Sequence, residues 1–413
     1  MKKQIKTILL LLTLCAFQLN AQFTLYTPEN SALPSVNISD IVVDYDNTIW
    51  LATDSGVVEI RNNQWVTHNT ENSLLPYNRV KDLFLDNYGE LFIYCDESIF
   101  KYNQNGFELV RNNVFGTTFA VDNNGSILVN TNYSLLRSNQ DGWDTLVYRP
   151  KVNATLIDKI VVDKMNNVYY KYSNFGELWV INSENLPKQI EKDKNDNRLI
   201  EPYDISLDSN QNLWISGDRK LQYYNVNNDM LMTYDKEFSS VFDQLLVRKT
   251  CVNKNNIPYS VLSTNFFDTP YLIFLYDNKI YHYNLDEYFS QEVFDWAVNA
   301  MAIDLDDNVW IHISDVGLLK FDPSISSVNL LPNTKYTIYP NPTTSSLRIE
   351  LENDELATSY KITDTKGKQV LTGSLSPSSS VSIDVEQLTV GVYLIELTTS
   401  SGEMIIDKFV KRD

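Results

Sequence analysis

The sequence predicts an all-β protein, a seven-bladed β-propeller followed by a small immunoglobulin-like β-sandwich. A short motif that recurs seven times, apolar β-branched runs before each copy, and a change of composition near residue 324 support this prediction. In the motif an acidic or amide anchor follows an aliphatic residue and precedes a bulky residue by six positions. The anchors are Asp44, Asp86, Asp122, Asp163, Asp208, Asn253 and Asp304. Self-similarity at intervals of 36 to 51 residues is typical of repeat architectures.

Each repeat has the pattern of a four-stranded antiparallel sheet. The apolar run Ile41–Val43 predicts a buried strand, and a second strand begins at Ile49 after a tight turn. A second turn such as Asp54–Gly56 follows. Third and fourth strands come next, as at Ser98–Tyr102 and Gly106–Val110 in the second repeat. The residues three positions after the anchors suit a tight turn, and they are Asn47, Gly89, Gly125, Asn166, Gln211, Asn256 and Asp307. Four strands in ~43 residues is the pattern of a propeller blade.

The two ends of the repeat region predict how the ring closes. Gln64–His68, the outer strand of the first blade, leads into Glu71–Pro76, and Gln22–Tyr26 leads into the similar Glu29–Pro34. The last repeat ends near Phe321 without an outer strand of its own. We therefore expect Phe23–Thr27 to supply the outer strand of the last blade, which would remove an open sheet edge.

The first 21 residues have the features of a secretory signal peptide. Lys2, Lys3 and Lys6 precede an apolar stretch from Ile8 to Phe17, and cleavage is expected after Ala21. This stretch is too short to span a membrane, and no later segment is long enough either, so no transmembrane segment is expected. The predicted propeller therefore occupies residues 22–325.

The mature chain keeps two cysteines, Cys95 and Cys251, which fall in the second and sixth blades. These blades lie nearly opposite each other in a seven-membered ring, beyond the Cα separation that a disulfide allows. The sequence therefore predicts two free, buried thiols.

The chain is strongly acidic, with 34 basic and 53 acidic residues. Loss of three lysines with the signal peptide would lower the net charge from −19 to −22. Such a surface repels nucleic acid and anionic lipid at long range, so no nucleic-acid partner is expected. The acidity is typical of a soluble exported protein.

The amino-acid composition of the sequence changes after the propeller. Residues 326–333 form a linker, and residues 334–413 contain alternating strand patterns with more Ser and Thr and fewer aromatic residues. Six or seven short strands in this length predict a small β-sandwich. Four motifs follow in order: Tyr339-Pro340-Asn341-Pro342, Asp364-Thr365-Lys366-Gly367, Gly391-Val392-Tyr393 and the terminal Lys408-Phe409-Val410-Lys411.

These four motifs resemble the type A C-terminal sorting domain of the type IX secretion system. The resemblance implies export through the periplasm, recognition by an outer-membrane translocon, and removal of the domain by a sortase-like peptidase. It also implies a final location outside the cell or on the outer-membrane surface. Within the motifs we expect Pro340 and Pro342 to stiffen the chain, and Gly367 and Gly391 to permit turns. We expect the terminal residues from Lys408 to Asp413 to be read by the secretion machinery.

The repeats resemble the propellers of two-component regulators. The segment Trp50–Val57, preceded by Asp44 and Asn47, carries this resemblance best, together with Asp304–Gly317. No kinase helix pair, ATP-binding glycines or DNA-binding helix accompanies the repeats. The resemblance therefore implies a free-standing propeller.

The sequence shows no catalytic constellation. His68, His282 and His312 lie in separate strand contexts, and no nucleophile elbow or phosphate loop is present. Acidic residues on the second turns, Asp54, Asp96, Asp218 and Asp315, would lie on one face of the ring, where two of them could serve a glycosidase or lyase. Chance alignment on so acidic a surface explains them better.

The repeats contain residues that suggest two kinds of ligand, calcium and glycans. The acidic runs at Asp44–Asp46 and Asp304–Asn308 suggest calcium, but they lack the central Gly and the final Glu of a calcium loop, and turn formation explains them. No cofactor is therefore assigned. The many tyrosines suggest glycan binding, although aromatic residues in strands usually pack between blades, as we expect of Trp50, Trp214 and Trp310. A sugar site would then use loop aromatics such as Phe266 or Phe175.

We conclude that the sequence favours an exported, non-enzymatic binding or adhesion scaffold for protein or glycan. The alternative is a polysaccharide-active hydrolase or lyase built on the same propeller. The sequence identifies neither the ligand nor the cleavage point before the sorting domain.

Overall fold

The computed structural model describes residues 23–412, except for 132–133, 149–155, 174–175, 183, 244, 264–269, 277, 286–297, 324–335, 352–355, 365–367 and 401–403. It divides into two compact units, residues 1–325 and 326–413, which are described separately below. The signal peptide with Ala21, the linker, the loop aromatics Phe175 and Phe266, and the motif residues Lys366 and Gly367 lie outside the described residues.

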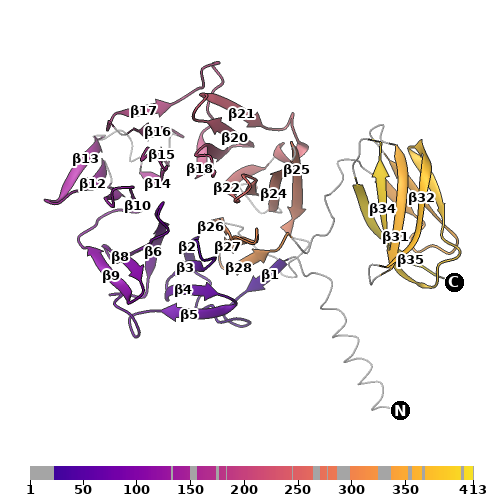
Figure 1. Ribbon diagram of the computed structural model, residues 1–413, viewed down its shortest axis with the longest axis horizontal. Helices are drawn as coiled ribbons and strands as arrows, with labels where there is room; N and C mark the ends of the chain where they lie inside the picture. Colours follow the sequence, from indigo (N-terminus) through magenta and orange to yellow (C-terminus); the bar gives the residue numbers. More distant parts are fainter. Residues whose placement is uncertain are drawn as a thin grey trace, which may run out of the picture. The chain divides into compact units, whose positions relative to one another are not determined.

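The first unit is a ring of seven four-stranded antiparallel sheets (Figure 1), which confirms the predicted propeller. The innermost strands contact one another in chain order around the ring, and the last of them contacts the first. These strands are β2 (Ile38–Val43), β6 (Val80–Leu85), β10 (Phe119–Val121), β14 (Ile157–Val162), β18 (Pro202–Leu207), β22 (Leu246–Val252) and β26 (Val298–Ile303).

The second strand of every blade is buried along its whole length, because both of its faces pack against neighbouring blades. These strands are β3 (Ile49–Thr53), β7 (Leu91–Cys95), β11 (Ile127–Asn130), β15 (Val168–Tyr172), β19 (Leu213–Gly217), β23 (Pro258–Ser263) and β27 (Val309–Ile313). They carry the bulky repeat residue, and Trp50, Trp214 and Trp310 are buried there as predicted.

The outer half of each blade is formed by the third and fourth strands. The third strands are β4 (Gly56–Arg61), β8 (Ser98–Asn103), β12 (Ser134–Ser138), β16 (Leu178–Ile181), β20 (Lys220–Asn225), β24 (Tyr271–Tyr276) and β28 (Gly317–Phe321). The fourth strands of the first six blades are β5 (Gln64–His68), β9 (Gly106–Arg111), β13 (Trp143–Tyr148), β17 (Pro187–Ile190), β21 (Met230–Tyr234) and β25 (Lys279–Asn284). The short 3₁₀ helix η2 (Ser240–Phe242) connects β21 to the next blade.

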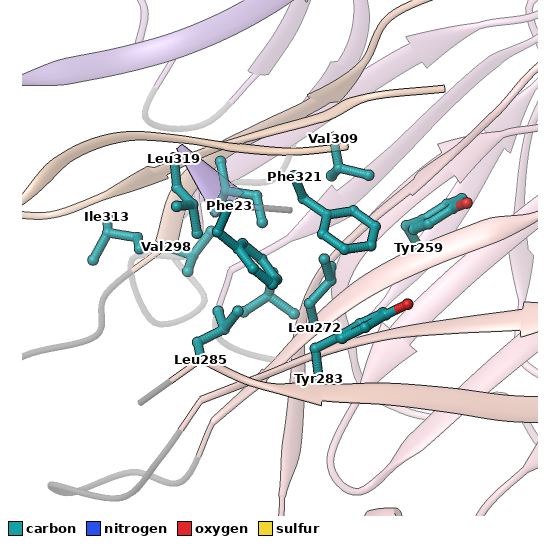
Figure 2. Packing of buried hydrophobic residues seen from close by; sticks show 12 residues of the cluster. Phe23, Tyr259, Leu272, Tyr283, Leu285, Val298, Val309, Ile313, Leu319 and Phe321 are labelled. Atoms are coloured by element: carbon teal, nitrogen blue, oxygen red, sulfur yellow. The ribbon is translucent and has the colours of Figure 1, made fainter. Parts of the chain in front are cut away.

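The seventh blade takes its fourth strand from the other end of the chain. Strand β1 (Phe23–Tyr26) pairs antiparallel with β28, with Phe23 opposite Phe321 and Tyr26 opposite Leu318. Figure 2 shows the Phe23 side chain among Phe321, Tyr283 and Leu285, where it joins the last two blades. The predicted closure of the ring by the N-terminal segment is confirmed.

The tight turn after each anchor also forms as predicted. All seven residues that lie three positions after an anchor have positive φ, from 62° at Asn47 to 83° at Gly89. Asn and Gly adopt this left-handed region at little cost, which explains their frequency at this position.

The second unit is a β-sandwich of two sheets. One sheet contains β29 (Tyr336–Tyr339), β30 (Ser346–Leu351) and β33 (Ser380–Asp384). The other contains β32 (Gln369–Ser378), β31 (Ala357–Asp364), β34 (Gly391–Thr399) and β35 (Met404–Lys411). Buried Leu347, Ile349, Ile362, Ile395 and Phe409 fill the space between the sheets.

Cys95 and Cys251 are both free, as predicted, but only Cys95 is buried. The prediction that both thiols are buried was wrong for Cys251, which is half-buried. Cys251 lies on the innermost strand β22, and its side chain packs only at the margin of the hydrophobic cluster between the sixth and seventh blades.

Candidate functional site

The anchor residues build turns. The Asp44 Oδ1 atom accepts hydrogen bonds from the backbone N–H groups of Asp46 and Thr48, both at 2.9 Å. The same pair of bonds recurs at the anchors Asp86, Asp122, Asp163, Asn253 and Asp304. Nowhere in the described part of the chain are three His, Cys, Asp or Glu side chains grouped to hold a metal ion.

Several of the turn residues also form hydrogen bonds to a neighbouring blade. Asn47 Oδ1 accepts the backbone N–H of Leu305 at 2.6 Å, which joins the seventh blade to the first. Similar bonds run from Asn123 to Asn166, from Lys164 to Gln211 and from Ser209 to Asn256. The sequence pattern predicted the turn at these positions but not this second role between blades.

A cluster of charged side chains, which we call the axial cluster, lies on the innermost strands four positions before the anchors. It consists of Asp40 on β2, Asp82 on β6, Lys159 on β14, Asp204 on β18 and Lys249 on β22. Each of these residues directly follows a β-bulge near the start of its strand. Charged residues at one fixed position of the repeat, near the start of otherwise apolar strands, are the sequence signal for this cluster, and the sequence-based prediction did not include it.

The aspartates of the axial cluster bond to the neighbouring blade. Asp40 Oδ2 accepts the Leu83 N–H at 3.2 Å, and Asp204 Oδ2 accepts the Thr250 N–H at 3.3 Å. Asp82 Oδ2 accepts the Thr118 hydroxyl at 3.1 Å and the backbone N–H of Phe119 at 3.4 Å. These bonds satisfy N–H groups at the free edges of the inner strands, which would otherwise lack protein partners.

Burial and proximity change the ionisation of the axial cluster. Burial raises the pKa of Asp82 well above its ordinary value, and the neighbouring Asp40 charge raises it further. Burial also raises the pKa of Asp40, while the Asp204 carboxylate raises the pKa of Lys159. Asp40 and Asp82 therefore form a carboxyl pair in which protonation of one member is favoured.

The acidic residues predicted on the second turns lie apart from one another. Asp54, Asp96, Asp218 and Asp315 occupy the turns between the second and third strands of four different blades. Asp54 accepts hydrogen bonds from Asn37 and Ser55, and Asp218 pairs with its neighbour Arg219. None of the hydrogen bonds or ion pairs found among the described residues joins two of these four carboxylates.

The histidines also remain separate, on β5, β25 and β27. His68 Nε2 lies 3.0 Å from Glu59 Oε2, and His312 Nε2 donates to the Val36 carbonyl at 2.9 Å. Burial lowers the pKa of His312, which favours its neutral form.

A groove of about 560 Å³ lies between the fifth and sixth blades. Trp214, Tyr223 and Tyr234 line it from the fifth blade, and Tyr276 from the sixth. Asn255, Asn256 and Asn278 are placed on turns of the sixth blade at the same groove, and none of the described lining residues is charged. We call this the 5–6 groove. Its strand aromatics pack between blades as predicted, but they also line an open site, which the sequence did not indicate.

The hydrogen bonding of Trp214 differs from that of its counterparts. Trp50 Nε1 donates to Asp44 Oδ2 and Trp310 Nε1 donates to Asp304 Oδ2, both at 2.9 Å. Trp214 follows Asp208 at the same spacing, yet its buried Nε1–H has no acceptor in the described structure. An unsatisfied buried donor costs about 1–3 kcal/mol, so the wall of the groove is a locally unfavourable arrangement.

The motifs of the tail come together in the sandwich. Asn341 Oδ1 accepts the Val410 N–H at 2.9 Å, and the Thr343 N–H donates to the Val410 carbonyl at 2.8 Å. Tyr393 stacks on Phe409 with ring centres 5.6 Å apart, and Asp364 pairs in register with Tyr393. Gly391 begins β34 opposite Lys411, which is buried. The first and last motifs thus meet at the C-terminal strand.

Residues 337–412 match the family described as the secretion system C-terminal sorting domain, and residues 32–55 match the two-component regulator propeller. The chain carries a type IX sorting domain. That domain implies export to the cell surface or the extracellular space and interaction with the secretion machinery. No described helix is long and apolar enough to cross a membrane. No match was found among curated proteins.

Several solved structures share the fold at low sequence identity. The extracellular domain of the hybrid two-component system BT3049 from B. thetaiotaomicron is 15% identical, with a TM-score of 0.55 over 95% of this chain and 57% of that one. PorZ, a surface component of the type IX secretion system of Porphyromonas gingivalis, is 13% identical, with a TM-score of 0.52 over 92% and 60%. Virginiamycin B lyase from Staphylococcus aureus is 13% identical, with a TM-score of 0.51 over 73% and 99%. This chain spans less than two thirds of the first two proteins, and the likeness shows the fold alone.

Proposed function

We propose that this exported propeller is a non-enzymatic scaffold that binds a ligand outside the cell through one face of its ring. The observation that carries the proposal is the 5–6 groove, an open concave surface whose described lining consists of aromatic, amide and apolar side chains without an acid or a base. Such a lining supports recognition, since general acid–base catalysis needs titratable groups within hydrogen-bonding reach of the ligand.

The carboxylates of the ring support the same reading. Asp40, Asp82 and Asp204 each hold a backbone N–H of the next blade, so they serve the framework of the ring. The second-turn carboxylates stand on separate blades without bonds to one another. The translocon and a sortase-like peptidase are the partners proposed for the sorting domain.

A polysaccharide-active enzyme is the second candidate, and the Asp40–Asp82 pair is the observation that favours it. A carboxyl pair that shares one proton is an arrangement used by acid–base enzymes. The propeller of virginiamycin B lyase belongs to a protein named as a lyase, which is compatible with chemistry on such a ring.

The two candidate functions differ in whether incubation with a polysaccharide releases products. The purified mature chain, residues 22–413, is incubated with a panel of polysaccharides with and without calcium, and its melting temperature and released sugars are recorded. Stabilisation without products supports the scaffold. Released oligosaccharide overturns the non-enzymatic proposal, and loss of that release in Asp82→Asn would assign it to the axial pair. Capture of a surface protein with no response to any polysaccharide would retain the scaffold with a protein ligand.

A further inference from the structure

We infer that the 5–6 groove is a binding site for an uncharged oligosaccharide. This inference rests on the proposed binding function and names its site and ligand class. It follows from the packing difference beside the groove, from the chemistry of its lining and from the absence of charge among its described lining residues.

The groove opens because the sixth blade carries smaller side chains than the second at matching positions. Cross-strand pairing aligns Phe92 with Lys101 in the second blade and Tyr259 with Phe274 in the sixth, and Phe92 and Tyr259 both follow their anchors by six residues. The next residues, Tyr102 and Leu275, therefore occupy equivalent positions.

The same alignment extends to the outer strand. Tyr102 pairs with Phe107, and Leu275 pairs with Ile280. In the second blade the Tyr102 ring lies 4.7 Å from the Trp50 ring and also contacts Phe107, so these two rings cover the Trp of the preceding blade. At Trp214 an aliphatic pair replaces both rings, and the uncovered space becomes the groove.

The aromatic side chains that line the groove differ in how far they are exposed. Trp214 is 5% exposed and stacks with Tyr234 at its base, whereas Tyr276 is 54% exposed. Tyr223 is half-buried beside Trp214, with ring centres 4.9 Å apart. Flat rings in an open groove offer apolar faces to the C–H faces of sugar rings, with a polar hydroxyl at the edge of each Tyr.

The amides supply matching hydrogen-bonding groups. Asn255 and Asn278 are exposed, and neither side chain has a hydrogen bond among the described residues. Each carboxamide carries two donors and an acceptor, which complements the adjacent hydroxyls of a sugar. Asn256 is partly engaged, because its Oδ1 accepts the Ser209 N–H and hydroxyl.

The charge of the lining selects among glycans. Charged residues make up 21% of the chain, yet the described lining residues of the groove include none. A uronic acid or sulfated sugar would find no cation among these residues and would meet a strongly acidic protein. An uncharged sugar loses no ion hydration on binding there, so the site favours neutral rings.

The test uses the mature chain and four neutral hexasaccharides, maltohexaose, cellohexaose, laminarihexaose and mannohexaose, with hexagalacturonate as the acidic comparison. Binding is measured by isothermal titration calorimetry. We expect at least one neutral probe to bind, hexagalacturonate not to bind, and Tyr276→Ala and Asn278→Ala each to weaken binding at least tenfold.

The matched control is Tyr148→Ala, since Tyr148 is 65% exposed on β13, in the third blade, and should not affect affinity. Failure of every neutral probe, or unchanged affinity in Tyr276→Ala, overturns the inference. If the wild-type chain still binds a polysaccharide or surface protein in the preceding experiment, and Tyr276→Ala binds it equally well, the scaffold function stands and only the groove assignment fails.

Discussion

At the residue scale, one position of the repeat carries different chemistry in different blades. The position four before the anchor holds Asp in the first, second and fifth blades and Lys in the fourth and sixth. Because these positions converge on the axis of the ring, residues that are distant in sequence interact electrostatically. The repeat thus contains a charge network that no single copy of the motif reveals.

Asp82→Asn is expected to make the stability of the protein less dependent on pH. The pKa of Asp82 is higher in the folded state than in the unfolded chain, so its contribution to stability is complete below the ordinary pKa near 3.8 and is lost as pH rises through the folded value. The melting temperature of the variant, relative to wild type, should therefore increase between pH 4 and pH 8, by roughly 2–4 °C per kcal/mol recovered.

Scanning calorimetry across this pH range checks the expectation. Asp218→Asn is the matched control, because its side chain is 51% exposed on a second turn. A difference between Asp82→Asn and wild type that stays constant with pH would contradict the pKa assignment.

The two Trp environments predict unequal costs for the same substitution. Trp50→Phe removes the donor to Asp44 Oδ2, whereas Trp214→Phe removes a donor that has no acceptor among the described residues. Since loss of a partner at a buried polar group costs about 1–3 kcal/mol, Trp50→Phe should be the more destabilising by about that amount. Urea denaturation of both variants provides the measurement, and equal losses would show that the indole bond contributes little.

At the element scale, the closing strand β1 has a larger role than its four residues suggest. It completes the seventh sheet, and Phe23 and Tyr26 extend to the sixth and first blades, where Tyr26 contacts Trp65 at a ring distance of 5.2 Å. The strand therefore stabilises three blades at once, including the point where the two ends of the ring meet.

Phe23→Ala should destabilise the propeller strongly. Its ring lies 4.9 Å from Phe321 and is buried, and replacing a buried Phe with Ala costs about 3–5 kcal/mol. Thermal unfolding should show a fall of several degrees, and deletion of Phe23–Tyr26 should show at least as large a fall. Leu74→Ala, at a side chain that is 72% exposed, provides the control. An unchanged melt in both β1 variants would show that closure by β1 does not stabilise the ring.

At the scale of the whole molecule, the two units have separate tasks. The propeller carries the candidate ligand site, and the sorting domain directs export. In the sorting domain the last strand is structural as well as terminal, because Phe409 is fully buried and Val410 bonds to Asn341 and Thr343. Recognition of the end and folding of the sandwich are therefore connected.

Removal of Phe409–Asp413 should leave the protein in the periplasm. This deletion takes a ring from the core and removes the bonds between the first and last motifs. Removal of Arg412 and Asp413 alone retains Phe409, so it separates recognition of the terminus from folding. Cell fractionation and surface protease accessibility measure the outcome, and normal surface display of the five-residue deletion would contradict the assignment.

The sequence alone determined the fold class, the number of blades, the closing strand and the sorting domain. It could do so because each of these depends on local patterns, such as anchor spacing, β-branched runs and turn residues, that act over a few neighbouring positions. The positive φ at Asn47 and the burial of Trp50 were both predictable in this way.

Only the tertiary structure decided which side chains meet. The axial cluster assembles residues from five blades, and the 5–6 groove depends on whether Leu275 or a larger ring faces Trp214. Sequence spacing gives the position of a residue within its own blade, but contacts between blades depend on the shapes of two packed surfaces at once. For this reason the repeat pattern predicted the ring, whereas the candidate site could be identified only from the tertiary structure.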